Sequence, residues 1–269
     1  MSRLLITNDD GIDAPALLPL AKALARLGSV DVVVPDRERS WISKAITRHD
    51  PIRVERLSRD GVELHTISGY PADCVQLGVH NLTPEPPTAV VSGINVGSNS
   101  GSAFLSGSGT VGAAVEAANT GVPALAFSAR SVGAWEDWAP WAWTTDSIPM
   151  WERLAVIATE VVETVLQHGF PDGVDVLSVN MPGDADVGTP RAVTRVAVTK
   201  YGRLFKPATD AVMTHAFDGA LEVLGDADGT DVDVVASGHV SITPIRVAVT
   251  APMGDTLRSA LETRRGVGS

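Results

Sequence analysis

Two adjacent aspartates, Asp9 and Asp10, end a short apolar run in the stretch LLITNDDG at residues 4–11. Adjacent carboxylates repel each other, and burying either one without a partner is costly. A hard divalent cation such as Mg²⁺ or Mn²⁺ resolves this conflict, because such ions take carboxylate and amide oxygens as ligands. The alternative is that one aspartate only caps the helix that follows. Since a helix needs one cap, the pair favours a metal site.

Neutral oxygen ligands follow two other apolar runs. Ser40 and Ser43 lie in the loop VVPDRERSWIS at 33–43, and Asn95 and Asn99 lie in SGINVGSNSG at 92–101. Taken alone, the first loop is typical of a solvated turn and the second of a flexible loop. Ligands of parallel sheets bind outside the carboxyl ends of the strands. The convergence of aspartate, serine and asparagine at three strand ends therefore favours one shared site.

A run of small residues, SGSGTVGAA at 106–114, opens a predicted helix. Backbone N–H groups at a helix N-terminus attract anions, and small side chains let a phosphate approach. Gly107, Gly109 and Gly112 also fit G-x-G-x-x-G, which would indicate a non-catalytic nucleotide-binding or dinucleotide-binding protein. That pattern belongs directly after the first strand of a βαβ unit. No good strand precedes it here, so we discount this interpretation.

These residues need a scaffold, and the apolar periodicity supplies one. Short runs rich in Val, Ile and Leu alternate with helical patterns, which predicts an α/β fold with a mainly parallel sheet and helices on both faces. The predicted strands are 3–7, 30–34, 62–67, 88–92, 124–128 and 175–180. The predicted helices are 14–27, 72–81, 110–120 and 150–168. We assign residues 1–183 to this catalytic core.

The pattern changes after residue 183. Segments 191–199, 216–224 and 239–250 are β-like, and glycine-containing acidic turns such as 225–233 separate them. We expect a β-rich extension over 184–250, with a long hairpin and a return to the core, then a C-terminal helix over 251–265 and a tail that ends at 269. Residues 131–151 hold five of the six tryptophans, a pattern more typical of core or interface than of a substrate lid.

Composition restricts the class of partner. The net charge of the 269 residues is −11, which argues against duplex nucleic acid, although a bound cation would still admit a small phosphorylated substrate. The single cysteine, Cys74, excludes an internal disulfide and is expected to be buried. No apolar run approaches the roughly 18–20 residues of a membrane helix, and the start of the chain does not resemble a signal peptide. We therefore expect a cytoplasmic protein without a membrane partner.

Four stretches, in chain order, carry a resemblance to a known family. They are TNDDGIDAP at 7–15, VPDRERSWIS at 34–43, VVSGINVGSN at 90–99 with SGTVGAA at 108–114, and HVSITPIRV at 239–247. The helix start YPADCVQLGV at 70–79 is also similar. Together they resemble the survival protein E (SurE) nucleotidases over nearly the whole chain. The resemblance implies a Rossmann-like three-layer αβα sandwich whose C-terminal β-hairpin extension is exchanged between subunits of a homodimer or homotetramer.

The resemblance also implies a phosphomonoesterase that hydrolyses nucleoside 5′- or 3′-monophosphates and holds one divalent cation, Mg²⁺ or Mn²⁺, per subunit. The metal ligands of the family fall on Asp9, Asp10, Ser40 and Asn95, and Asp9 and Asp10 are also the catalytic candidates. The candidates for binding phosphate or substrate are Ser43, Trp41, Asn99, Ser108, Gly109 and Thr110.

Two departures from the family pattern lie beside the expected pocket. Trp41 occupies a position where the family usually has glycine, and SGSAFLSG at 100–107 lacks the acidic residues and tyrosine that are common there. Trp41 would either stack on a base or pack against a neighbouring loop. These departures motivate an alternative substrate, a phosphorylated intermediate of a specialised metabolite.

Overall fold

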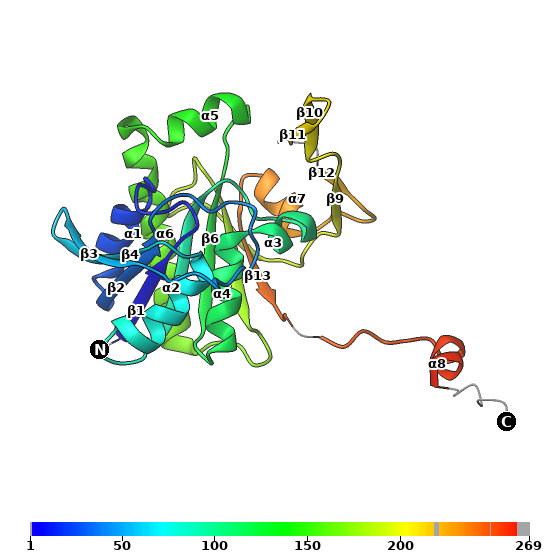
Figure 1. Ribbon diagram of the computed structural model, residues 1–269, viewed down its shortest axis with the longest axis horizontal. Helices are drawn as coiled ribbons and strands as arrows, with labels where there is room; N and C mark the ends of the chain where they lie inside the picture. The colour runs from blue at the N-terminus through cyan, green and yellow to red at the C-terminus, as the bar shows by residue number, and fades with distance from the viewer. Residues whose placement is uncertain (1, 218–220, 248, 263–269) are drawn as a thin grey trace.

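The centre of the molecule is a nine-stranded sheet (Figure 1). The computed structural model describes residues 2–217, 221–247 and 249–262. The strand order is β3-β4-β2-β1-β5-β6-β7-β13-β8. The strands are β1 (Ser2–Thr7), β2 (Gly28–Pro35), β3 (Val54–Arg59), β4 (Val62–Ile67), β5 (Ala89–Val96), β6 (Ala124–Arg130), β7 (Val176–Pro182), β8 (Arg191–Val193) and β13 (Val240–Ile245). The run from β4 to β7 is parallel throughout, so its carboxyl ends share one edge.

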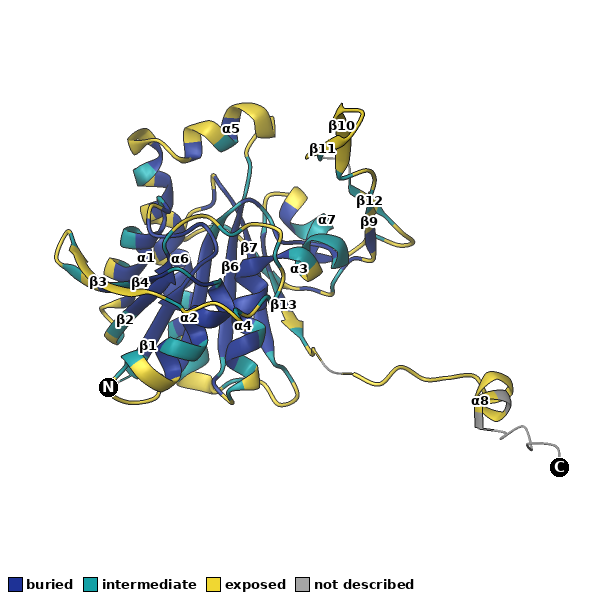
Figure 2. Ribbon diagram, in the orientation of Figure 1, coloured by how far each residue is buried: buried dark blue, intermediate teal, exposed yellow. Residues whose placement is uncertain are grey.

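Helices cover both faces of this sheet. Side chains of β1 alternate between two hydrophobic clusters, because successive residues of a strand point to opposite faces. Leu4 and Ile6 join the cluster formed with α1 (Leu17–Leu24) and α6 (Ile148–His168). Leu5 joins the cluster formed with α2 (Pro71–Leu77) and α4 (Gly109–Asn119). Figure 2 shows the buried strands between these layers. The predicted three-layer αβα sandwich is confirmed.

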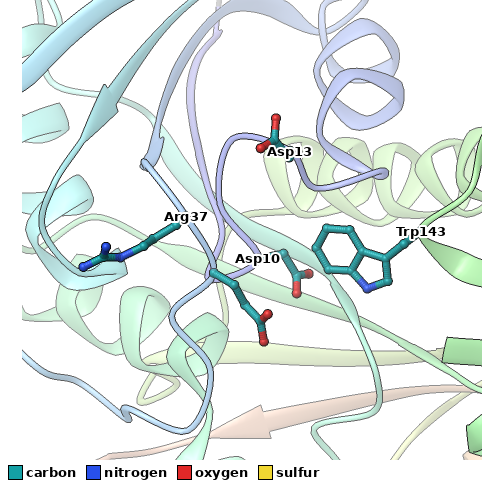
Figure 3. A pocket seen from close by; sticks show the side chains of 5 residues that line it. Asp10, Asp13, Arg37 and Trp143 are labelled. Atoms are coloured by element: carbon teal, nitrogen blue, oxygen red, sulfur yellow. The ribbon is translucent and has the colours of Figure 1, made fainter. Parts of the chain in front are cut away.

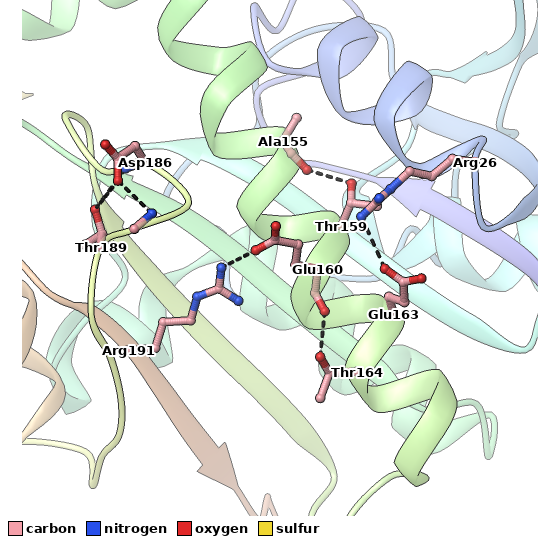
Figure 4. Close-up of polar contacts among 10 residues, drawn as sticks. Arg26, Ala155, Thr159, Glu160, Glu163, Thr164, Asp186, Thr189 and Arg191 are labelled. Atoms are coloured by element: carbon pink, nitrogen blue, oxygen red, sulfur yellow. Dashed lines mark hydrogen bonds and ion pairs between the residues drawn. The ribbon is translucent and has the colours of Figure 1, made fainter.

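Two ion pairs link the long helix α6 to its neighbours (Figure 4). Arg26, just after α1, pairs with Glu163 at 3.3 Å, and Arg191 of β8 pairs with Glu160. These pairs are partly exposed, so each adds little stability, and the buried apolar face of α6 supplies most of the attachment.

Each of the six predicted core strands and four predicted core helices has a counterpart, with shifted ends. The helix predicted over 14–27 begins at Leu17, because residues 11–17 form hydrogen-bonded turns first. The helix predicted over 72–81 continues from α2 as a π-helix, Gly78–Leu82. The sequence interpretation missed β3, whose residues are mostly exposed. It also missed the short helices α3 (Ser102–Gly107), α5 (Trp135–Ala142), Thr145–Ser147 and α7 (Asp231–Ala236).

The extension after residue 183 contains two antiparallel pairs. β9 (Thr199–Tyr201) pairs with β12 (Leu221–Val223), and β10 (Phe205–Thr209) pairs with β11 (Val212–His215). They project from the sheet in Figure 1. The strand expected over 216–224 is reduced to β12 in the described residues, and positions 218–220 lie outside them. The prediction that the acidic stretch 225–233 is only a turn was wrong, because Thr230 caps the helix α7 there. The domain boundaries remain predictions.

The C-terminal segment leaves the body of the molecule in Figure 1. It contains α8 (Asp255–Glu262), which agrees with the expected helix over 251–265 within the described residues. Residues 251–259 are exposed. Cys74 is buried, as expected. In the part of the chain that the structure describes, no helix combines the length and the apolar character needed to cross a bilayer.

Candidate active site

A tight turn after β1 fixes the two aspartates. The Asn8 side chain bonds Gly11 twice: its Nδ2 donates to the Gly11 carbonyl and its Oδ1 accepts from the Gly11 N–H, both at 3.0 Å. Gly11 has φ of +84°, and a Cβ there would lie 2.5 Å from the carbonyl carbon of Arg37. Only glycine fits such a conformation and approach. The turn therefore holds Asp9 and Asp10 in one arrangement at the carboxyl edge of the sheet.

Both carboxylates are buried, with exposed fractions of 3% for Asp9 and 5% for Asp10. Asp9 accepts a short hydrogen bond from the Thr110 hydroxyl. Asp10 accepts one at 3.0 Å from the N–H of Val96, at the end of β5. Among the described residues, no lysine, arginine or histidine forms an ion pair with either carboxylate. Two buried carboxylates thus share a site without a balancing positive side chain.

Burial makes both aspartates hard to ionise. Desolvation raises the pKa of Asp9 to about 6, although the Thr110 hydrogen bond opposes the rise. Desolvation, followed by repulsion from the Asp9 charge, raises the pKa of Asp10 well above its usual range. Perturbations of this kind, with a stated physical cause, are typical of functional sites. A cation bound between the two carboxylates would reverse the penalty.

The two neutral ligand candidates lie on loops that contact this turn. The N–H of Arg39 donates to the Asp9 carbonyl at 2.7 Å, which brings the loop carrying Ser40 beside Asp9. Ser40 is exposed, and its hydroxyl donates to Glu38 at 2.6 Å. Asn95 lies in β5, next to the residue whose N–H binds Asp10, and its Nδ2 donates to the Gly97 carbonyl at 2.6 Å. That bond leaves the Asn95 amide oxygen for a ligand.

Carboxylates alone would not complete a metal site. In the described residues, no three His, Cys, Asp or Glu side chains group closely enough to hold an ion. A cation at Asp9 and Asp10 would therefore need neutral oxygens, such as those of Asn95, Ser40 or water, to fill its coordination shell.

The start of α4 lies against the other side of Asp9. Ser108 caps this helix, because its hydroxyl accepts from the N–H of Val111 at 3.1 Å. A Cβ at Gly109 would lie 2.8 Å from the Cβ of Asp9, so glycine permits the close approach. The N–H groups of the first residues of a helix have no partner inside it. The helix start therefore presents donors next to the buried carboxylates.

Asn99 occupies a buried loop behind these residues. Its N–H donates to Asn180 at 2.8 Å, and its Nδ2 donates to the Ser128 hydroxyl at 2.8 Å. The side chain of Asn99 is thus directed to β6, and its backbone is held by β7. The sequence interpretation missed Asn180 and Ser128, although they end two of the predicted strands. The Nδ2 of Asn180 is buried without a hydrogen-bond partner, so it can donate to a ligand or a water molecule.

Trp41 packs among other aromatic rings. It has φ of +57°, and its ring lies 5.4–5.9 Å from the rings of four residues of α3 and the projecting hairpin region. These four are Phe104, Tyr201, His215 and Phe217. The nearby Ser43 donates its N–H to Gly107 at 3.0 Å. These contacts favour packing for Trp41, and the substrate roles of Trp41 and Ser43 remain predictions.

A pocket of about 270 Å³ opens on the Asp10 side (Figure 3). Its lining residues are Asp10, Asp13, Arg37, Glu38 and Trp143. A larger pocket of about 390 Å³ lies beside α1 and the β3–β4 hairpin and contains none of the predicted site residues. The smaller pocket is therefore the one next to the chemistry, and it adds Trp143 and Glu38 to the residues that sequence reasoning missed as site residues.

The fold and this site define a class: an α/β protein whose buried carboxylate pair faces a helix N-terminus at the edge of a parallel sheet. The family described as Survival protein SurE matches residues 4–205. The 5′-nucleotidase SurE of Methanocella arvoryzae is 35% identical over 93% of each chain. That of Pelobacter propionicus is 38% identical over 92% of this chain and 94% of its own. The chain belongs to the SurE family.

A solved structure agrees with this assignment. The SurE protein from Aquifex aeolicus is 31% identical and superposes with a TM-score of 0.76. The match covers 97% of this chain and 100% of that chain. The family resemblance expected from the sequence motifs is confirmed.

The contact between α4 and the Ser43 loop gives a stability prediction. Replacing a helical glycine by alanine normally stabilises by about 0.5–1 kcal/mol. At Gly112, however, a Cβ would lie 2.3 Å from the carbonyl oxygen of Ser43. We expect Gly112→Ala to lower the free energy of unfolding by about 1–3 kcal/mol, measured by urea denaturation. Gly107→Ala is the control, since its Cβ would meet only the Trp41 ring, at 3.6 Å. Equal stability of the two variants would contradict the packing argument.

The carboxylate pair gives a second prediction. Asp10→Asn removes one buried charge and keeps an oxygen for the Val96 N–H, so it should stabilise the metal-free protein at pH 7 by on the order of 1 kcal/mol. Because burial raises the folded-state pKa of Asp10, the wild-type protein gains stability as the pH falls, and the difference should narrow at pH 5. Urea denaturation in EDTA measures both effects.

A matched control is Asp172→Asn, because Asp172 is exposed and its loss should change stability by less than about 0.5 kcal/mol. An Asp10→Asn variant that is less stable than wild type at pH 7 in EDTA would show that the carboxylates do not repel.

Proposed function

We propose that this chain is a divalent-metal-dependent phosphomonoesterase that hydrolyses nucleoside 5′- or 3′-monophosphates to nucleoside and phosphate. The observation that carries the proposal is the buried pair Asp9 and Asp10, which has no positive side chain for balance and faces the start of α4. The relatives named 5′-nucleotidase SurE support the same chemistry, since phosphate release from a nucleotide is phosphoric monoester hydrolysis.

The proposed ligands for one Mg²⁺ or Mn²⁺ per subunit are Asp9, Asp10, Asn95 and Ser40. The residues fit such an ion because two buried carboxylates lack a counter-charge, and Asn95 directly precedes Val96, whose N–H binds Asp10 at the same strand end. A bound divalent cation supplies positive charge against the phosphoryl oxygens. Ser40 would have to leave Glu38 to take part, since its hydroxyl bonds Glu38 in this structure.

The protein's own groups supply the remaining chemistry. Thr110 holds Asp9 in place through its hydroxyl and its backbone N–H, and the N–H of Gly109 at the helix start would donate to a phosphoryl oxygen. Ser108 keeps this helix start in position as its cap. One of the two aspartates orients the water that attacks phosphorus in line with the leaving oxygen.

The two alternatives, a non-catalytic dinucleotide-binding protein and a phosphatase for a specialised metabolite, are less favoured. Gly109 and Gly112, which belong to the apparent dinucleotide pattern, are explained by close approaches to Asp9 and Ser43. The names of the relatives favour nucleotides over a specialised metabolite.

We also propose that the chain forms a homodimer or homotetramer in which the extension is exchanged. The support is apolar surface that one chain leaves uncovered: Phe205, Val212 and Met213 on the hairpin, and Leu257 and Leu261 on α8, are all more than half exposed. Large apolar side chains left exposed in this way are typical of interaction sites. The cytoplasmic location remains a prediction from the sequence.

Phosphate release tests the function. Wild-type protein should release phosphate from nucleoside monophosphates and from an aryl phosphate when Mg²⁺ or Mn²⁺ is present, and release should stop in EDTA. Loss of a residue that supports a metal ligand typically lowers activity by about 10- to 100-fold. Because Asp9 and Asp10 are proposed as ligands themselves, Asp9→Ala and Asp10→Ala should each lower turnover by more than this. Circular dichroism should show an intact fold. Turnover retained in both variants would place the catalytic site elsewhere.

A further inference from the structure

The backbone below Trp143 is firmly held. Trp143 follows α5 as its C-cap. The carbonyl of the preceding Ala142 accepts hydrogen bonds from the Ser147 hydroxyl at 2.8 Å and from the Trp151 indole N–H at 3.0 Å. Ser147 and Trp151 are both buried. The position of Trp143 at the pocket is therefore set by the start of α6, a rigid part of the core.

The Trp143 ring itself is left without a partner. Trp135, Trp138 and Trp151 form a chain of ring contacts at 5.8 and 6.4 Å. Trp143, in contrast, is 40% exposed, and within the described residues its ring makes no aromatic contact or hydrogen bond. Figure 3 shows the indole beside Asp10 across the pocket. A held but unpaired aromatic face next to the reacting groups is suited to stacking on a flat ligand.

The other walls of the pocket select the charge of that ligand. Asp10 and Glu38 are acidic. Arg37 is the one cation among the lining residues, but its guanidinium lies 4.0 Å from Asp36 and is directed away from Trp143 in Figure 3. Asp13 is paired with Arg59 at 2.8 Å. The proposed cation would balance Asp10, so Glu38 is the acidic group that remains on the pocket wall. The pocket therefore suits an uncharged group whose hydroxyl or amino groups donate to carboxylates.

The size of the pocket points the same way. Its volume of about 270 Å³ is just below the roughly 300 Å³ at which pockets for small molecules usually begin. It therefore suits part of a ligand, such as a base with its sugar, and is too small for a dinucleotide.

We propose that Trp143 binds the nucleobase of the substrate by stacking, with the nucleoside in the pocket between Trp143, Asp10 and Glu38. The inference rests on the proposed function, because it takes the phosphate to lie at Asp9 and the start of α4. It makes Trp143 a substrate-binding residue that sets the preference for nucleotides over phosphates without a base.

Two substrates that differ only in the base test this assignment. AMP and ribose 5-phosphate share the phosphate and the sugar, so steady-state kinetics with saturating Mg²⁺ isolates the base. Trp143→Ala should raise KM for AMP by about 5- to 100-fold, as expected for loss of base stacking, with kcat nearly unchanged because the base is bound equally before and during the reaction. The constants for ribose 5-phosphate should stay unchanged.

Two further variants serve as controls. Trp143→Phe keeps a flat ring and should retain most of the affinity for AMP. Trp141→Ala removes a tryptophan that is also 40% exposed but does not line the pocket, and it should match wild type for both substrates. An equal loss for AMP and ribose 5-phosphate in Trp143→Ala would mean that Trp143 only supports the fold. No change for AMP would also overturn the assignment.

Failure of the proposed function would look different. In that case wild-type protein would release phosphate from neither substrate. The inference is then decided by calorimetric titration of AMP into wild type and Trp143→Ala with Mg²⁺ present. Weaker binding in the variant by the same 5- to 100-fold supports it, and equal binding overturns it.

Discussion

Asp9 and Asp10 repel each other in a place from which the fold removes water. β1 lies between β2 and β5, so the end of this strand is enclosed by the ends of its neighbours. Arg39 reaches the pair from the loop after β2, Val96 from β5 and Thr110 from α4. Each contact fixes one side of the pair, and none supplies a full positive charge. Without a cation, the buried pair lowers the stability of the fold. A bound cation would remove this penalty, so the pair favours metal binding.

Close backbone approach is what allows three elements to meet at this pair. Gly11 lies against Arg37, Gly109 against Asp9 and Gly112 against Ser43, each at distances that a Cβ would violate. The glycines at 109 and 112 thus answer a packing requirement. The same requirement operates in dinucleotide-binding proteins, where a helix start must approach a ligand. This explains why the sequence contains a G-x-G-x-x-G pattern although no strand directly precedes it.

Apolar periodicity predicts from the sequence that Asp9, Asp10, Ser40 and Asn95 follow strands that end at one edge of the sheet. The start of α4 was predicted separately, from its run of small residues. Neither pattern could predict how the polar side chains pair. The Ser40 hydroxyl bonds Glu38, and the Asn99 amide bonds Ser128. Such choices depend on neighbours that are distant in the sequence. Trp143 was hidden for the same reason: the tryptophan-rich stretch contains buried and exposed rings, and only the three-dimensional packing separates them. α7 was missed because its acidic residues are typical of a turn.

The two sides of the carboxylate pair have opposite chemistry, and under the proposed function this difference would orient a bound nucleotide. On the Asp9 side, the start of α4 presents N–H donors, which attract the phosphate. On the Asp10 side, Glu38 adds negative charge and Trp143 adds a flat apolar face, which together suit a base better than a phosphate. A nucleotide placed the other way would set its anion against Glu38 and leave the helix start without an acceptor. Under the proposed function, the helix N–H groups and the Glu38 charge would orient the nucleotide, and the indole face would favour the base.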